Sequence, residues 1–314
     1  MKIQENLICL APMEGVVDGL MRSVLTSVND FDLCIAEFVR VVDTLVPKHI
    51  FYKICPELHS NGNTSANTPV RVQLLGQNPT WMAENAIRAI ELGSHGIDIN
   101  FGCPAKAVNK SKGGAILLKT PEQIYKIVST VKQAVGKDID VSVKIRLGFE
   151  DSNLLDENVS AIVSANADLL TIHARTKTDG YRPPAYWDYI GKINNNFPIP
   201  IIANGEIWSN EDAQRCKLVT KTNHLMLGRG ILALPNLANV IKFGHKPMSW
   251  LDMRTLLLNY CDLELLGDKS YYFSSRLKQW LRYLRLQYPQ AETLFQLVKP
   301  LKNKQEILTL LNRQ

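Results

Sequence analysis

The chain has 314 residues, of which 46% are hydrophobic and 21% are charged, with 18 glycines and 15 prolines. Such a chain can bury a large core, which excludes a disordered or collagen-like protein and predicts one large domain, alone or with a smaller one. The formal net charge is +6, no run of residues is long and apolar enough to cross a bilayer, and the first residues lack a secretion signal, so we expect a cytoplasmic protein.

Eight short apolar runs along the first 230 residues predict β-strands. They cover residues 7–13, 33–39, 70–76, 96–102, 141–148, 169–175, 199–207 and 224–230. Helical patterns lie between them, for example at residues 78–93, 120–136 and 209–219. Strands that alternate with helices build a parallel sheet, and eight such units over roughly 240 residues predict an α/β fold of the (β/α)8 TIM-barrel type. An open doubly wound sheet is the competing fold, which the absence of G-x-G-x-x-G after the first strand disfavours.

Only helical patterns follow residue 243, at residues 249–267, 274–288 and 292–312. We therefore expect a barrel domain of residues 1–243 and an all-helical C-terminal domain of residues 244–314. Leu277, Trp280, Leu281 and Leu284 form one apolar stripe on the middle helix. Residues 269–304 contain eight Lys/Arg, one acid and seven aromatic residues, a local charge of +7. This segment either binds nucleic acid or is a solvated helix whose aromatic side chains pack inward.

The six cysteines are widely spaced, with no C-x-x-C and no Cys/His pair at metal spacing. This pattern argues against a metal site, an iron–sulfur cluster and a disulfide framework, so each thiol is considered singly. Cys103 differs from the others because "GIDINFGCPAK" presents it between a glycine and a proline, directly after a predicted strand. Gly102 allows a sharp turn and Pro104 fixes the exit direction, so we expect the thiol at a defined point in the loop.

Polar residues gather at the carboxyl ends of the predicted strands, which is where TIM barrels place their active sites. They are Glu14, Glu37, Arg40, Gln73, Asn100, Cys103, Lys144, Arg146, His173, Arg175, Asn204, Glu206 and Arg229, and beside them at the same strand ends lie Pro12, Met13, Gly205, Gly228 and Gly230. The glycine loops after the last two strands predict a phosphate site, to which Arg229 adds a charged fork. Lys144 lies on an apolar strand, where a lysine needs an electron-rich partner. His173 alone would be a core histidine, but beside Lys144 it becomes a candidate ligand contact.

Taken in order, the segments "APMEG", "RVQLLG", "DINFGCP", "VSVKIRLG", "IHART", "ANGEI" and "LGRG" resemble the motifs of the tRNA-dihydrouridine synthases. Residues 31–58 and "SRLKQWLRYLR" resemble the bacterial C-type branch, which modifies uridine 16 in the D-loop of tRNA. The resemblance implies FMN in the barrel mouth and NADPH or NADH as a transient reductant. It implies that the flavin is held by Pro12, Met13, Glu14, Gln73, Lys144, His173, Asn204, Gly205, Glu206, Gly228 and Arg229.

The same resemblance implies the chemistry and the substrate contacts. FMN passes a hydride to C6 of uracil and Cys103 donates a proton to C5. The extruded base is contacted by Asn100, Arg146 and Tyr181, and the tRNA backbone by Arg40, Arg276 and Lys278. We expect a monomer, because tRNA would occupy much of the basic face, and, from the cysteine spacing and the lack of a long apolar run, neither a metal nor a membrane as a partner.

Two other functions remain open on the sequence. The first is an FMN-dependent reductase or dehydrogenase of a free pyrimidine or another small conjugated substrate, because such enzymes share the barrel and the phosphate site. The second is a barrel without redox function that only binds RNA. The basic, aromatic tail disfavours the first, and a flavin absorption band in the purified protein would exclude the second.

Overall fold

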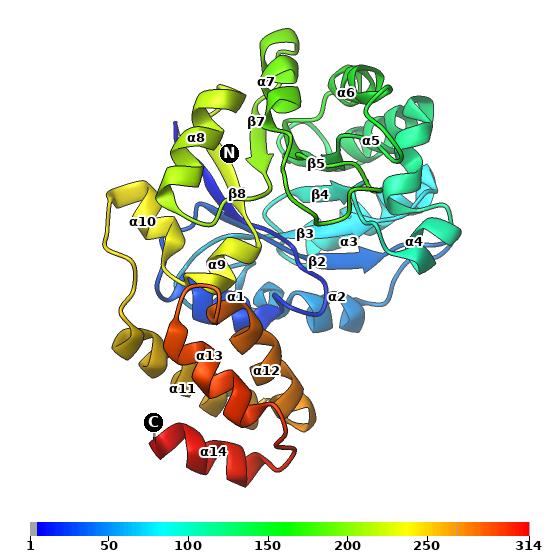
Figure 1. The fold of residues 1–314 in the computed structure, drawn as a ribbon. Helices are drawn as coiled ribbons and strands as arrows, with labels where there is room; N and C mark the ends of the chain where they lie inside the picture. Colours follow the sequence, from blue (N-terminus) through cyan, green and yellow to red (C-terminus); the bar gives the residue numbers. More distant parts are fainter. Residues whose placement is uncertain (1–4, 268, 314) are drawn as a thin grey trace.

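The computed structural model describes residues 5–267 and 269–313, and its centre is a closed barrel of eight parallel strands in sequential order (Figure 1). The strands are β1 (Ile8–Leu10), β2 (Leu33–Arg40), β3 (Val70–Leu75), β4 (Ile97–Asn100), β5 (Val141–Arg146), β6 (Leu169–His173), β7 (Ile201–Asn204) and β8 (His224–Leu227). β1 pairs with both β2 and β8, which closes the sheet. The predicted (β/α)8 barrel is therefore confirmed.

The barrel interior is filled by every second residue of the strands. An apolar cluster of Leu7, Cys9, Ala11, Leu33, Ile35, Leu169, Ile202 and Met226 occupies one part of it. The alternating positions of β3, β4 and β5 are instead polar: Arg71 and Gln73, Asp98 and Asn100, Ser142 and Lys144. Because successive side chains of a strand point to opposite faces, the intervening valines and isoleucines face the surrounding helices and build the main core.

Helices cover the outside of the barrel. They are α1 (Gly19–Thr26), α2 (Lys48–Ile54), α3 (Pro79–Glu91), α4 (Lys106–Lys110), α5 (Pro121–Val135), α6 (Leu155–Ser164), α7 (Trp187–Asn196), α8 (Asn210–Thr220), α9 (Arg229–Ala233) and α10 (Leu237–Phe243), with 3-10 turns η1 (Pro56–Ser60) and η2 (Gly114–Lys119). The predicted ends of two of them are correct: Asn78 caps α3 by accepting from the Trp81 amide, and α5 stops at Gly136, whose φ is 85°. Pro79 at the first helical position explains the start of α3, and Gly136 after the last helical position explains the end of α5.

Four further helices follow the barrel: α11 (Trp250–Leu266), α12 (Phe273–Leu284), α13 (Pro289–Val298) and α14 (Lys304–Arg313), with η3 (Ser270–Tyr272) before α12. In Figure 1 they lie together below the barrel. The prediction of a single helix over residues 292–312 is wrong, because the helical conformation is interrupted around Pro300, between α13 and α14. Proline has no backbone N–H and restricts the residue before it, so the helix ends at Val298.

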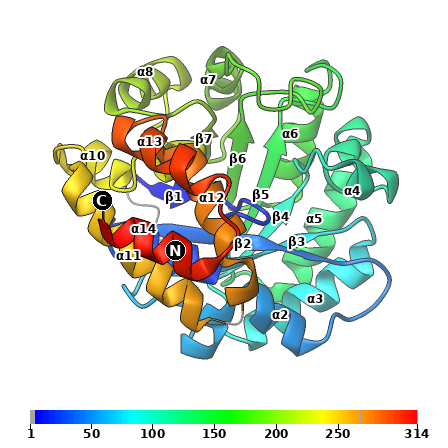
Figure 2. The same cartoon turned by 60° about the horizontal axis from the view of Figure 1, so that its bottom comes forward.

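Helix α12 joins this helical layer to the barrel. The four residues of its predicted apolar stripe are 2% exposed or less, and Trp280 donates from Nε1 to the Leu232 carbonyl on α9 at 3.1 Å. Seen from below, α12 and α13 lie in front of the barrel strands (Figure 2). A second link is ionic: Asp18, the N-cap of α1, pairs with Lys269 at 2.7 Å and with Arg276 at 2.9 Å.

Among the helices of residues 5–267 and 269–313, none is both long and apolar enough for a membrane crossing. In the same residues, no group of three or more His, Cys, Asp or Glu side chains is arranged to hold a metal ion. All six cysteines are buried free thiols.

Candidate active site

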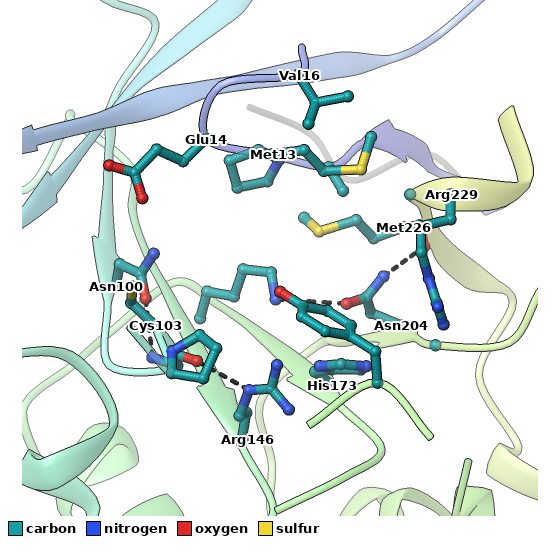
Figure 3. Close-up of a pocket in the computed structure, with 18 of the residues that line it drawn as sticks. Met13, Glu14, Val16, Asn100, Cys103, Arg146, His173, Asn204, Met226 and Arg229 are labelled. Atoms are coloured by element: carbon teal, nitrogen blue, oxygen red, sulfur yellow. Dashed lines mark hydrogen bonds between the residues drawn. The ribbon is translucent and has the colours of Figure 1, made fainter. Parts of the chain in front are cut away.

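A cavity of about 650 Å³ opens at the carboxyl ends of the strands. A volume of this size is typical of a small-molecule or cofactor site. Its lining includes seventeen of the residues placed in the site from the sequence: Pro12, Met13, Glu14, Glu37, Gln73, Asn100, Cys103, Lys144, Arg146, His173, Tyr181, Asn204, Gly205, Glu206, Gly228, Arg229 and Gly230. In Figure 3, Asn100 and Cys103 lie on one side of the cavity, and Asn204 and Arg229 on the other. Residues of eight strands or of the loops after them therefore line one site.

The three residues predicted to contact the tRNA backbone, Arg40, Arg276 and Lys278, lie outside the cavity lining, as does Arg175. Arg40 is exposed and donates to Ser111 Oγ at 2.6 Å. Lys278 is half-buried and donates to the Leu301 carbonyl. Arg276 differs from the expected open surface cation: its side chain is 11% exposed, because its guanidinium pairs with Glu264 at 2.6 Å as well as with Asp18. Phosphate binding by these three side chains stays a prediction.

The backbone around Cys103 is fixed by four hydrogen bonds. The Gly102 amide donates to Asn100 Oδ1 at 2.8 Å, and the Gly102 carbonyl accepts from Arg146 Nε at 2.9 Å. The Cys103 carbonyl accepts from the Ala115 amide at 3.1 Å and from Asn109 Nδ2 at 3.0 Å. Gly102 does not have the positive φ that a sharp glycine turn would suggest. These hydrogen bonds, rather than a left-handed turn, set the position of the thiol.

Gly114, which follows Cys103 in the chain, packs directly against the cysteine. Its φ is 68°, and a Cβ there would lie 2.9 Å from the Cys103 carbonyl oxygen and 3.1 Å from Cys103 Cβ. Only glycine fits both the backbone conformation and the close approach. The segment around residues 113–114 thus packs directly behind the cysteine and supports its position.

The Cys103 thiol is suited to act as an acid. Its residue is 8% exposed, and burial raises the pKa of the thiol above its ordinary value. The group therefore stays protonated at neutral pH and can donate a proton. Burial also raises the pKa values of Cys9, Cys34, Cys55, Cys216 and Cys261, but these five are not part of the cavity lining.

Lys144 and His173 supply hydrogen-bonding groups inside the cavity. Burial lowers the pKa of Lys144 to about 8, so the ammonium remains charged at neutral pH. Among the described residues its one hydrogen bond is to Asn204 Oδ1 at 3.3 Å, which leaves most of its donor capacity for a ligand. Burial and then the charges of Arg146 and Lys144 hold the pKa of His173 well below its usual range, so this imidazole is neutral.

The loops after β7 and β8 form one charged wall. Gly205 has a φ of 118°, and a Cβ there would lie 3.0 Å from the His173 ring, so glycine keeps this wall open. Glu206 pairs with Arg229 at 2.6 Å and with the buried Arg175 at 2.8 Å. Burial opposes ionisation of Glu206, but the hydrogen bonds from Arg175 and Trp208 outweigh it and lower the pKa of the carboxyl group. Arg229 is thus held by Glu206 at the cavity edge instead of extending freely.

The outer rim of the cavity combines an aromatic ring with cations. Tyr181 is 54% exposed, and the guanidinium groups of Arg146 and Arg229 each lie 5.2 Å from its ring centroid. Arg146 is also tied to the Thr176 and Gly180 carbonyls at 3.0 and 2.9 Å. Such an arrangement can stack on a planar group and bind its negatively charged neighbours.

The sequence did not single out several residues of the site. Phe38, Trp208 and Tyr283 line the cavity, and Asp98 lies in the barrel interior beside Gln73. Tyr283 belongs to α12, and no local pattern indicates that this helix reaches the cavity. Asp98 could have been found, because it is an acid between two isoleucines of a buried strand, the same signal that Lys144 gives.

Comparisons with known proteins agree with this geometry. The family model described as "Dihydrouridine synthase (Dus)" matches residues 9–312. A protein of Shewanella oneidensis named tRNA-dihydrouridine(16) synthase is 56% identical over 306 residues, covering 98% of this chain and 97% of its own length. One of the same name from Escherichia coli K12 is 50% identical over 301 residues, covering 96% of each.

Solved structures with low sequence identity share the fold. Histamine dehydrogenase from Rhizobium sp. 4-9 superposes with a TM-score of 0.58 at 13% identity, over 82% of this chain and 48% of that one. Morphinone reductase superposes with a TM-score of 0.52 at 12% identity, over 77% and 88% of the two chains. On the match to nearly the whole sequence and the identities to curated relatives, the chain belongs to the dihydrouridine synthase family.

Proposed function

We propose that this protein is an FMN-dependent enzyme that reduces one uridine in the D-loop of tRNA, uridine 16, to 5,6-dihydrouridine. The observation that carries the proposal is that the Cys103 thiol, whose pKa is raised by burial, and the buried ammonium of Lys144 line the same cavity at the mouth of the barrel. The position of the target nucleotide is supported by the relatives, which are named tRNA-dihydrouridine(16) synthase.

The donors and acceptors of the cavity fit FMN. Lys144 Nζ and Gln73 Nε2 have hydrogen-bonding capacity left for the polar edge of an isoalloxazine ring. Gly205 and Gly228 carry no side chain where β7 and β8 end, and a Cβ on Gly228 would lie no closer than 3.8 Å to other atoms. Asn204, His173 and Arg229 line the same end of the cavity. We assign the ring to the Gln73–Lys144 side, flanked by Pro12, Met13 and Glu14, and the phosphate to the β7 and β8 loops.

Cys103 is the general acid in this proposal. When bound, FMN supplies the hydride that C6 of the uracil accepts. Cys103 then donates its thiol proton to C5, for which its raised pKa keeps it protonated. The hydrogen bonds to Gly102 and to the Cys103 carbonyl keep the thiol in place while the base enters. Lys144 holds its positive charge next to the ring edge, which favours an electron-rich ligand there.

The substrate base has to leave its stack to reach this cavity. We assign contacts with the extruded uracil to Asn100, Arg146 and Tyr181, which line the cavity, and stacking of the base to the exposed ring of Tyr181. We assign contacts with the tRNA backbone to Arg40, to Lys278 and to Arg276, the last of which is held by Asp18 and Glu264, and residues 244–314 to a tRNA-binding domain. We further propose that the protein acts as a cytoplasmic monomer and that NADPH, or NADH, reduces the flavin.

The experiment uses the full-length protein. It should purify with a flavin absorption band and, with NADPH, form dihydrouridine at position 16 in tRNA isolated from a strain without this gene. Dihydrouridine only at another position would overturn the choice of uridine 16. Reduction of free uridine but not of tRNA would replace the proposal with a small-molecule reductase, and a colourless protein that binds tRNA would remove the enzyme function.

A further inference from the structure

A carboxyl group that takes part in none of the steps above lies buried beneath the cavity. Asp98 on β4 is 1% exposed, and its register partners are Gln73 on β3 and Ser142 on β5. Its Oδ2 accepts from Gln73 Nε2 at 2.7 Å, and its Oδ1 accepts from Ser142 Oγ at 2.6 Å. Burying a carboxyl group is costly unless it is hydrogen-bonded. The function of Asp98 should therefore lie in its effect on its two hydrogen-bond partners, Gln73 and Ser142.

These contacts fix the orientation of two amide groups. A carboxylate accepts hydrogen bonds only, so the Gln73 amide must present its NH2 group to Asp98 and its oxygen to the other side. There Gln73 Oε1 accepts from Asn100 Nδ2 at 2.8 Å, and Asn100 Oδ1 accepts from the Gly102 amide at 2.8 Å. All three hydrogen bonds are therefore donated in one direction, from the Gly102 amide through Asn100 and Gln73 to the carboxyl group of Asp98.

The direction of these hydrogen bonds decides which polar groups Gln73 and Asn100 offer to a ligand in the cavity. Gln73 and Asn100 both line the cavity, whereas Asp98 and Ser142 lie below it. In the observed orientation each amide keeps one N–H that has no hydrogen-bond partner among the described residues and is available to a ligand in the cavity. Burial raises the pKa of Asp98, but Oδ2 accepts from Gln73 whether or not the other oxygen carries a proton.

We propose that Asp98 is a positioning residue for cofactor and substrate: by accepting from Gln73, it sets the donor pattern that Gln73 and Asn100 offer to the flavin and the uracil. This inference rests on the proposed function. Asp98 contacts neither ligand, so its effect passes through Gln73. Ser142 bonds to the same carboxyl group at the same level of the barrel but is not linked to Gln73, which makes it the matched control.

A double-mutant cycle on FMN affinity tests the link. In the full-length protein, Asp98→Ala should weaken FMN binding about three- to tenfold, the worth of one hydrogen bond. In a Gln73→Ala background the same change should have less than a twofold effect, because the residue through which Asp98 acts is gone. Ser142→Ala should change the affinity less than twofold. Equal effects of Asp98→Ala in both backgrounds, or none in either, would overturn the proposal.

A second pair of variants decides the matter if Asp98→Ala does not fold. Gln73→Glu sets two acceptors against each other and should weaken FMN binding more than tenfold. Adding Asp98→Asn supplies an N–H that can donate to Glu at position 73, so the double variant should recover at least threefold of the lost affinity. A double variant no better than Gln73→Glu would reject the positioning role, as a merely structural role gives no such recovery.

The proposed function and this inference fail in different ways. A wild-type protein that lacks flavin and leaves tRNA unchanged rejects the function. A wild-type protein that binds FMN and forms dihydrouridine, while the effects of Asp98 and Gln73 substitutions simply add, rejects the positioning role alone.

Discussion

Replacement of Cys103 by alanine separates the two halves of the proposed reaction. Because the thiol is 8% exposed and its pKa is raised by burial, it is the protonated acid at neutral pH. Its loss leaves protonation of C5 to water that enters the cavity. General acids contribute roughly 10²–10⁴-fold to a rate, so dihydrouridine formation should fall by at least about 100-fold, or about 3 kcal/mol of transition-state stabilisation.

Stopped-flow absorption of the flavin measures both halves in the same sample. Reduction of the bound flavin by NADPH should proceed at the wild-type rate, since no contact of Cys103 is needed for it, whereas reoxidation by tRNA should slow by the full factor. Cys216→Ala is the control, because this buried thiol on α8 is outside the cavity lining. The wild-type reoxidation rate should be flat through neutral pH and fall at alkaline pH, where the buried thiol deprotonates. A Cys103→Ala protein within threefold of wild type in tRNA turnover would refute the assignment.

Three further substitutions test other parts of the site and surface. Lys144 has a pKa of about 8 in the folded protein, against 10.5 for an exposed lysine, so the stability of the flavin-free protein should increase as the pH rises between these two values. Lys144→Met should raise the free energy of unfolding at pH 7 by about 1–3 kcal/mol and weaken FMN binding. A variant that is less stable than the wild type in urea unfolding would contradict this. Arg40→Ala with Lys278→Ala should flatten the dependence of log Kd for tRNA on log salt concentration by about 0.7–0.9 for each lost phosphate contact, with the flavin spectrum unchanged; an unaltered slope removes both residues from the interface. Arg276→Ala should cost about 3 kcal/mol of stability because it leaves the buried Glu264 without its cation; a cost below about 1 kcal/mol would mean that this ion pair is not important to the fold.

The periodic part of the molecule could be predicted from its sequence. Alternation of apolar residues and the Pro and Gly residues at helix ends depend on local backbone geometry, which is why β3, β5 and α3 lie where the pattern places them. The polar residues at the carboxyl ends of strands converge on one cavity because the parallel barrel brings those ends together. A single lysine or cysteine on such a strand is therefore informative.

Contacts between distant segments could not be predicted in this way. Arg276 reads as a surface cation until the fold brings it to Asp18, 258 residues earlier in the chain. Tyr283 was counted as one aromatic residue among several, although it lines the cavity. The break at Pro300 is the opposite case: the local signal was present, and the apolar periodicity on either side of it concealed the end of the helix.

Helix α12 touches two parts of the catalytic half of the molecule at once. Tyr283 forms part of the cavity wall, and one turn earlier Trp280 holds α9, the helix that begins with Arg229. A barrel truncated before Phe273 would therefore lose Tyr283 from the cavity lining and would also lose the Trp280 contact that supports α9. The C-terminal helices therefore do more than extend the surface of the barrel, because the lining of the cavity is complete only when they are present.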